Sequence, residues 1–155
     1  MDLLRTNYHW RNRYLLMRHG HSQANAQQKI ISSPERGLTN YGLSEQGEQQ
    51  LVDVLAQWRW PEPTRVVHSD FLRTTQTAAR VAAAFALNMQ KEERVRERHF
   101  GELDGQTDSY YPEVWAFDAQ SADHTQWHVE PVSRVAARMC AALDALEQRF
   151  EGETV

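Results

Sequence analysis

Two short apolar runs constrain the fold of this chain most, because each is followed by polar residues and then by an amphipathic helical stretch. The runs are Tyr14–Met17 and Arg65–Val67. The first is apolar without interruption, which is typical of a strand buried on both faces. A weaker third strand is predicted between residues 87 and 95. The alternation of strands and helices predicts an α/β fold with a mainly parallel sheet.

Apolar periodicity and capping residues predict three helices. The first begins near Ser44 and ends before Pro61, and Ser69 or Asp70 caps the second. The third begins at Pro131, a residue favoured at the first helical position. Its apolar stripe comprises Val132, Val135, Ala136, Met139, Leu143, Leu146 and Phe150. Residues 101–129 are irregular and rich in aromatic side chains, with one short helix expected near residues 112–117.

The length of 155 residues favours one domain. Residues 1–13 are interpreted as a polar N-terminal arm and residues 14–155 as the domain. The net charge of −4 argues against nucleic acid as the main partner, since binding it usually needs a basic surface. Cys140 is the only cysteine, so an internal disulfide is excluded.

The N-terminal stretch has recurring charges and no continuous apolar segment, so it does not resemble a secretory signal. No run in the sequence approaches the ~20 apolar residues of a membrane span. We therefore expect a soluble, cytoplasmic protein without a membrane partner.

Polar side chains with a shared chemistry follow the first two apolar runs. Arg18 and His19 end the first run, and Arg73 lies shortly after the second. Because ligands of open α/β sheets bind beyond the carboxyl ends of the strands, we expect both arginines to converge there. Two guanidinium groups suit a dianion such as phosphate. Ser22 and Asn25 would add neutral hydrogen bonds, and His19 would be the nucleophile.

Each of these residues also has an ordinary structural interpretation. Arg73 on a helix is by itself typical of a solvated or ion-paired side chain, and Ser22 and Asn25 are common loop residues. His19 and His21 are spaced like metal ligands, but two histidines without a third ligand are weak evidence for a metal. The pair of arginines at two strand ends is the more specific signal.

Five stretches in order resemble the histidine phosphatase superfamily, also called the phosphoglycerate mutase-like superfamily. RHGHSQAN is similar to its RHG signature, and GLSEQGEQQ to the opening of its first helix. VVHSDFLRTTQTAARVA resembles its second strand, turn and helix, whose arginine matches Arg73. VRERHFGELDG resembles the segment whose catalytic glutamate matches Glu97. EPVSRVAARM is similar to the start of its long C-terminal helix. The resemblance runs from about Tyr14 to Phe150.

The resemblance implies a three-layer αβα sandwich and a phosphoryl-transfer mechanism. His19 attacks the phosphoryl group and becomes a phosphohistidine, while the side chains of Arg18, Arg73 and Asn25 hold the phosphate oxygens. Glu97 protonates the leaving oxygen and then activates water. The mechanism needs no metal and no cofactor, and its substrate is a small phosphorylated molecule.

Two departures from the family pattern stand out. His21 replaces the Glu or Gln that usually follows RHG, which is most simply a tolerated change at the rim of the site. More seriously, the family's second catalytic histidine, in a Ser-His-Gly or Thr-His-Gly motif, has no match here. The resemblance implies that its strand follows the last helix, so Val155 would be its first residue and the sheet would lack its last strand or strands. An uncovered sheet edge is costly, which predicts that a second copy covers it by dimerisation or strand swapping.

Three functions remain open at this point. The first is a metal-independent phosphatase of small phosphorylated metabolites, with low or no activity in this chain by itself. The second is a phosphoglycerate mutase-type phosphotransfer, which residues 27–41 favour less because they lack a clear match to the mutase substrate loop. The third is a non-catalytic phosphate-ligand binder. The aromatic side chains of residues 101–129 would either line the pocket or roof the core; they are Tyr110, Tyr111, Trp115, Phe117 and Trp127.

Overall fold

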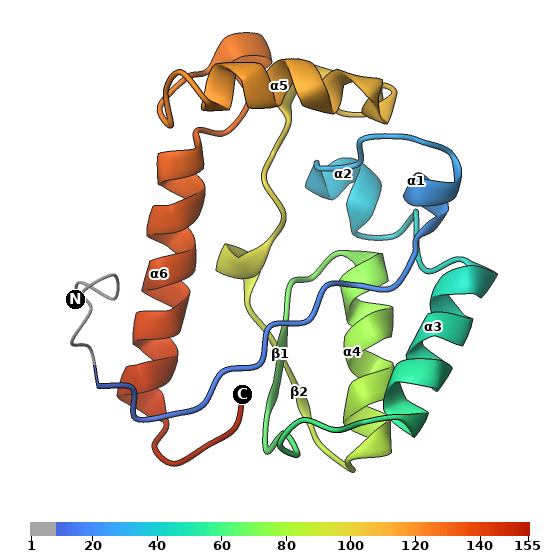
Figure 1. The fold of residues 1–155 in the computed structure, drawn as a ribbon, viewed down its shortest axis with the longest axis vertical. Helices are drawn as coiled ribbons and strands as arrows, with labels where there is room; N and C mark the ends of the chain where they lie inside the picture. Colours follow the sequence, from blue (N-terminus) through green and yellow to red (C-terminus); the bar gives the residue numbers. More distant parts are fainter. Residues whose placement is uncertain (1–8) are drawn as a thin grey trace.

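The computed structural model describes residues 9–155 as a small parallel sheet flanked by helices (Figure 1). The strands are β1 (Val66–His68) and β2 (Met89–Lys91). The α-helices are α1 (Gln23–Ala26), α2 (Pro34–Gly37), α3 (Glu45–Ala56), α4 (Leu72–Ala84), α5 (Tyr111–Asp118) and α6 (Val132–Arg149). Single 3₁₀ turns are η1 (Glu93–Val95), η2 (Gly101–Leu103), η3 (Asp108–Tyr110) and η4 (Gln126–His128).

The two strands form the centre of the α/β architecture that the sequence predicts. They pair in parallel with Val66 opposite Met89. In Figure 1 they lie between α6 on one side and α4 with α3 on the other. Val66 shares a buried cluster with Ala78, Val81 and Ala82, so α4 closes one face of the sheet. The site residues predicted at the strand ends therefore start from a packed βα unit.

The first apolar run departs from the prediction, because Tyr14–Met17 is extended but forms no strand. Leu16 is 94% exposed and Met17 43% exposed, so the prediction of a strand buried on both faces is wrong for this structure. A strand needs backbone partners on its flanks. In this run the Leu15 N–H donates to the Val155 carbonyl at 2.8 Å, but the described residues form no continuous ladder with it. The run therefore stays outside a sheet layer.

Two predicted caps have different outcomes. Ser44 caps α3 as predicted, and its side chain accepts a hydrogen bond from the Gly47 N–H. The prediction that Ser69 or Asp70 caps α4 is wrong, because the N-cap residue is Phe71. The Ser69 hydroxyl is bonded to that of Thr74, and the Asp70 carboxylate accepts from Arg96. Tertiary contacts therefore occupy both side chains that local sequence would assign to the cap.

The later elements lie where the sequence predicts them, with bounds that differ by up to four residues. Strand β2 lies inside the predicted range, and α5 covers the predicted short helix. Pro131 is the N-cap residue of α6 rather than its first helical residue. On α6 the buried residues are Ala142, Leu146 and Glu147, so the apolar stripe is only partly covered. None of the helices between residues 9 and 155 is both long enough and apolar enough to cross a membrane.

The chain just before the domain is attached to α6 through a buried carboxylate. Glu147, 2% exposed, accepts hydrogen bonds from the Arg11 N–H at 2.7 Å and from the Tyr14 hydroxyl at 2.6 Å. The Asn12 amide donates to the same carboxylate at 2.9 Å. Residues 11–14 are thereby fixed against the end of α6, while residues 1–8 of the predicted arm lie outside the described residues.

Candidate active site

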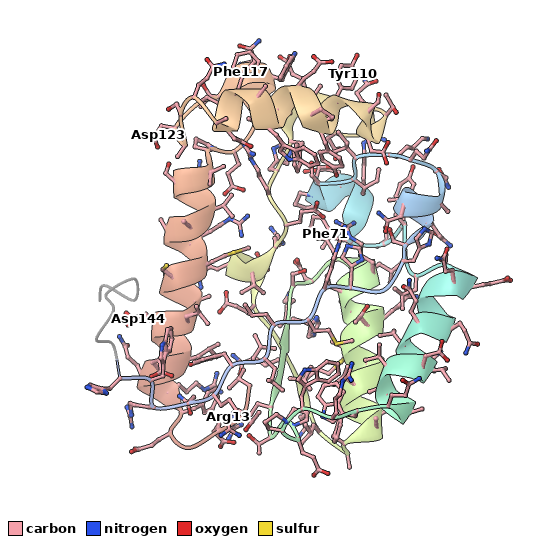
Figure 2. All side chains as sticks on the ribbon, viewed as in Figure 1. Arg13, Phe71, Tyr110, Phe117, Asp123 and Asp144 are labelled. Atoms are coloured by element: carbon pink, nitrogen blue, oxygen red, sulfur yellow. The ribbon has the colours of Figure 1, made fainter. Side chains whose placement is uncertain are left out.

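The loops beyond the carboxyl ends of the strands carry the predicted site, beneath the roof formed by α5 (Figure 1). Phe71, labelled in Figure 2, marks the start of α4 in this region. Its buried ring packs against Gly37 of α2, where a Cβ would lie 2.7 Å from the ring. This close approach needs a glycine, and it brings the 30–37 segment down onto α4 near Arg73.

His19 is half-buried, and both of its ring nitrogens have hydrogen-bond partners. The Nε of Arg73 donates to His19 Nε2 at 3.1 Å. A guanidinium group can only donate, so Nε2 is the acceptor and the proton of the neutral ring lies on Nδ1. Nδ1 in turn lies 2.7 Å from the Gly20 carbonyl oxygen, to which it donates. The ring is thereby oriented with the lone pair of Nε2 facing Arg73.

Arg73 is the centre of the site and is only 3% exposed. Besides His19, its guanidinium donates through Nη2 to the Glu97 carboxylate at 2.6 Å and to the Ile31 carbonyl at 3.0 Å. Its Nη1 atom is buried and has no hydrogen-bond partner among the described residues. A buried donor without an acceptor is unfavourable. The site therefore has one unused charged donor next to the histidine.

The structure thus brings three of the four predicted catalytic residues into direct contact. His19 follows the first apolar run, Arg73 lies in the first turns of α4, and Glu97 follows η1. Arg73 contacts both of the others, and the Glu97 side chain is 39% exposed. Glu97 can therefore face both the arginine and the solvent side of the site.

The electrostatic surroundings hold His19 in its neutral form. Burial is the main cause that lowers the pKa of His19 below its ordinary value of 6.5, and the charges of Arg73 and Arg18 lower it further. The hydrogen bond to Gly20 and the charge of Glu97 act in the opposite direction but do not reverse the shift. A neutral imidazole is the form that acts as a nucleophile.

Arg18, the fourth predicted catalytic residue, lies beside His19 but is not built into the cluster. Its side chain is exposed and makes no hydrogen bond or ion pair within residues 9–155. Its charge nevertheless acts on His19 and on Tyr111. The Arg18 guanidinium is therefore near the site but is not held there by a hydrogen bond or ion pair to any described residue.

Ser22 and Asn25 form the cap of α1. The Ser22 oxygen accepts from the Asn25 N–H at 3.2 Å, and the Asn25 Oδ1 accepts from the Ser22 N–H at 3.0 Å. The Ser22 hydroxyl also donates to Asn25 Oδ1 at 2.8 Å, and Ser22 is 1% exposed. The reciprocal pattern leaves the exposed Asn25 side chain with its amide Nδ2 atom unused among the described residues.

Sequence reasoning missed Thr77, which joins the histidine loop to α4. Its buried hydroxyl donates to the Arg73 carbonyl at 2.7 Å and accepts from the Gly20 N–H at 3.2 Å. A threonine four residues after the arginine was the available signal, since threonine hydroxyls bond the carbonyl one turn back. His21 also has a local role, because its Nδ1 lies 2.7 Å from the Ser44 hydroxyl at the start of α3.

The predicted aromatic segment mainly roofs the core. A buried cluster of Ile30, Phe100, Leu103, Val114 and Val129 is covered by Tyr110, Tyr111 and Trp127. Figure 2 shows Tyr110 and Phe117 near the two ends of α5 across the top of the molecule. The charges of Glu97, Arg73 and Arg18 act on the Tyr111 phenol.

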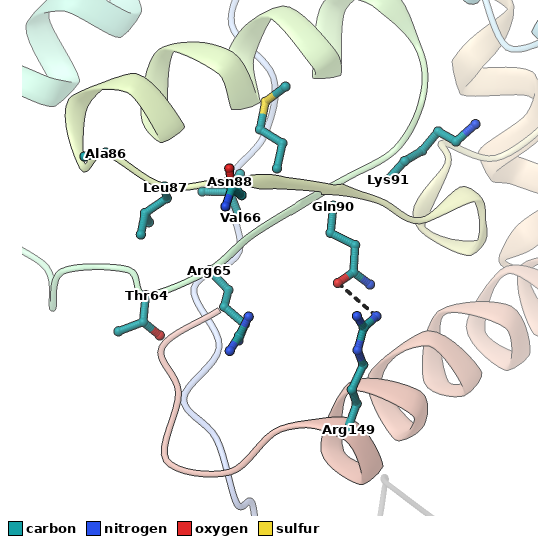
Figure 3. A pocket seen from close by; sticks show the side chains of 10 residues that line it. Thr64, Arg65, Val66, Ala86, Leu87, Asn88, Gln90, Lys91 and Arg149 are labelled. Atoms are coloured by element: carbon teal, nitrogen blue, oxygen red, sulfur yellow. Dashed lines mark hydrogen bonds between the residues drawn. The ribbon is translucent and has the colours of Figure 1, made fainter.

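A cavity of about 680 Å³ lies elsewhere, at the other end of the sheet. It is lined by residues at the start of β1, by residues 86–91 and by Arg149 near the end of α6 (Figure 3). Arg149 donates to the Gln90 side chain at 3.2 Å across it. None of the predicted site residues lines this cavity. Cavity and predicted site are therefore separate places.

The fold and the site define an α/β protein with a histidine, an arginine and a glutamate joined at the carboxyl ends of its strands. The sequence model of the histidine phosphatase superfamily (branch 1) matches residues 14–155, and the chain belongs to this family.

Relatives and solved structures agree with this membership. The probable phosphoglycerate mutase GpmB of Yersinia pestis (strain Pestoides F) is 33% identical over 135 residues, which are 84% of this chain and 60% of the relative. This chain thus spans about 60% of the length of the curated relatives that it matches. The structure of Bacillus stearothermophilus YhfR is 25% identical with a TM-score of 0.73, covering 93% of this chain and 71% of that one. A phosphoglycerate mutase from Bacillus anthracis str. Sterne, 17% identical over the same shares of the two chains, has the same fold with a TM-score of 0.72.

Proposed function

We propose that this chain carries the nucleophile and the phosphate-binding residues of a metal-independent phosphatase that acts on small phosphorylated metabolites through a phosphohistidine. The contact of Arg73 with both His19 Nε2 and Glu97 is the observation that carries the proposal. One buried guanidinium orients the nucleophile and the acid together. In addition, its unused Nη1 donor is suited to a phosphate oxygen.

Phosphate binding would rearrange the hydrogen bonds of Arg73. In the free protein its Nε donates to the atom that is to attack, His19 Nε2. A phosphate placed between them would take that N–H and the Nη1 donor, which frees the lone pair of Nε2 for phosphorus. Arg18, unattached in the free protein, would add a second guanidinium to the equatorial oxygens. The Asn25 amide would donate a neutral hydrogen bond, and Ser22 would position Asn25 rather than touch the phosphate.

The reaction proceeds in two displacements at phosphorus. The Glu97 carboxylate, paired with Arg73 in the free protein, first takes up a proton from solvent as the phosphate displaces it from the guanidinium. In the first displacement, His19 Nε2 forms a bond to phosphorus as the ester bond breaks, and Glu97 gives this proton to the leaving oxygen. In the second, the Glu97 carboxylate takes a proton from water, whose oxygen forms a bond to phosphorus as the bond to Nε2 breaks. Phosphate leaves and both side chains return to their starting forms. The Gly20 carbonyl holds the Nδ1 proton throughout, which stabilises the positive charge on the phosphorylated ring.

A mutase-type phosphotransfer is the second candidate, favoured by the 33% identity to a probable phosphoglycerate mutase. It uses the same nucleophile but must return the phosphoryl group to the substrate instead of to water. The two candidates differ in product: a phosphatase releases inorganic phosphate from phosphoglycerate, and a mutase forms the isomer.

The test is covalent labelling of His19. The chain is incubated with para-nitrophenyl phosphate in the presence of a chelator, and acid-labile phosphorylation is mapped by mass spectrometry. We expect labelling of the parent and of His21→Ala, a matched control two residues away, and none of His19→Ala. Equal labelling of His19→Ala would refute the proposal. A parent chain that binds phosphate through Arg73 but takes no label would support a non-catalytic phosphate-ligand binder instead.

A further inference from the structure

Tyr111 is the aromatic residue that links the roof of the molecule to the site. It is the first residue of α5, and the charges of Glu97, Arg73 and Arg18 all act on its phenol group. None of the steps described above uses it.

The Tyr111 ring is held by the same two chain segments that hold the catalytic groups. It packs edge to face on Phe100, three residues after Glu97, with ring centroids 5.1 Å apart. It also packs against the cluster that contains Ile30, the neighbour of the residue whose carbonyl anchors Arg73. On α5 itself, Trp115 stacks on it at 5.7 Å and an interplanar angle of 5°. The ring therefore has little freedom to turn away from the site.

The Tyr111 hydroxyl makes no hydrogen bond to any other residue that the structure describes. Although Tyr111 is half-buried, its hydroxyl oxygen is not one of the buried atoms left without a partner, so the hydroxyl is accessible to a ligand. Burial, followed by the nearby carboxylate of Glu97, raises the pKa of Tyr111 to about 12. The phenol thus keeps its proton at physiological pH and is available to donate it to an oxygen of an incoming ligand.

We propose that Tyr111 determines specificity by donating a hydrogen bond from its hydroxyl to an oxygen on the alcohol part of the substrate. This inference rests on the proposed function. With phosphorus between His19 and Arg73, the ester oxygen would face Glu97, and the alcohol part would lie near the segment after Glu97, where the Tyr111 ring packs on Phe100. The site then selects small aliphatic phosphate monoesters that carry a hydroxyl near the ester carbon.

Two ligands and two variants test the inference by binding. Glycerol 1-phosphate and propyl phosphate differ only by hydroxyl groups, and titration calorimetry gives the dissociation constant of each. One hydrogen bond of this kind contributes a factor of about 3 to 10 in affinity. We expect the parent to prefer glycerol 1-phosphate by that factor and Tyr111→Phe to bind both ligands equally. Tyr110→Phe, the matched control from the adjacent 3₁₀ turn, should keep the preference.

Melting temperature and affinity for inorganic phosphate distinguish a loss of substrate recognition from a loss of packing and from a failure of the proposed function. Tyr111→Phe keeps the ring, so its melting temperature and its affinity for inorganic phosphate should equal those of the parent. A parent without the preference, or a Tyr111→Phe variant that retains it, would overturn the inference while leaving the proposed function intact. Inorganic phosphate that binds the parent and Arg73→Ala equally would instead overturn the proposed function, and the inference with it.

Discussion

Arg73 and Arg18 flank the same histidine, yet they differ in burial and in hydrogen bonding. Arg73 is 3% exposed and bonded to His19, Glu97 and Ile31. Arg18 is exposed and has no hydrogen bond or ion pair within residues 9–155. The cause lies in the backbone segments to which the two arginines belong. Arg73 lies on a helix of 13 residues packed on β1, whereas Arg18 follows an extended run that belongs to no strand.

The difference shows that one half of the site is preorganised and the other half is not. The α4 half holds its guanidinium in place before any ligand arrives, so little ordering is required when phosphate binds. The Arg18 side chain has no such bonds among the described residues, so the ligand or a neighbouring chain would have to order it. The variants below change one half at a time.

Arg73→Ala should have the largest effect. It removes the donor that orients His19 and the unused Nη1 donor together, and removing one such donor costs about 10²–10³ in rate. We expect at least that loss in the rate of His19 phosphorylation, measured by rapid quenching and mass spectrometry. Arg73→Lys is the control, since it keeps the charge but not the fork and should recover only part of the rate. A loss no greater than that of Arg18→Ala would show that preorganisation does not matter here.

Leu16→Lys should weaken self-association. We propose that a second copy covers the uncovered run, in which Leu16 is 94% exposed. Burying one leucine contributes about 1.5–3 kcal/mol and each copy loses one, so the dimer dissociation constant should rise by at least about 10- to 100-fold. Light scattering at micromolar concentration measures it, with Val52→Lys on the exposed face of α3 as the control. A parent that is monomeric under these conditions contradicts the proposal.

Arg18→Ala should reduce affinity for inorganic phosphate about tenfold without affecting the fold, because an exposed side chain with no partner contributes little to stability. Calorimetric titration gives the affinity. Urea unfolding should give a free energy within about 0.5 kcal/mol of the parent. A larger loss of stability would mean that Arg18 is bonded in solution and that the two halves are alike.

The smallest effect is expected on the protonation of His19. Its lowered pKa means that the unfolded chain, with its ordinary value of 6.5, takes up a proton first as the pH falls. This contribution to stability is therefore complete above pH 6.5 and is lost as the pH falls through the folded value. NMR titration of the His19 ring should show a pKa below 6.5 that rises in Arg18→Ala and rises more in Arg73→Ala, because Arg73 is the stronger of the two charges. A value at or above 6.5 in the parent would contradict the burial of the ring.

The sequence predicted the elements whose causes are local. The cap at Ser44, the periodicity of α4 and α6, and the short strand at Val66 depend on neighbours a few residues away. The motifs around His19, Arg73 and Glu97 also predicted that these side chains meet, and the structure brings them into contact. Those motifs specify which side chains the family uses, and they say nothing of which ones are already bonded in the free protein.

The tertiary structure decided everything that depends on distant partners. The side chains of Ser69 and Asp70 could not cap α4 because Thr74 and Arg96 engage them. Tyr14–Met17 has the composition of a buried strand, but burial needs a neighbour on each side, and composition cannot supply one. The same reason separates the two arginines: a guanidinium is identical in both positions, and only the packing around it decides whether it is fixed or free.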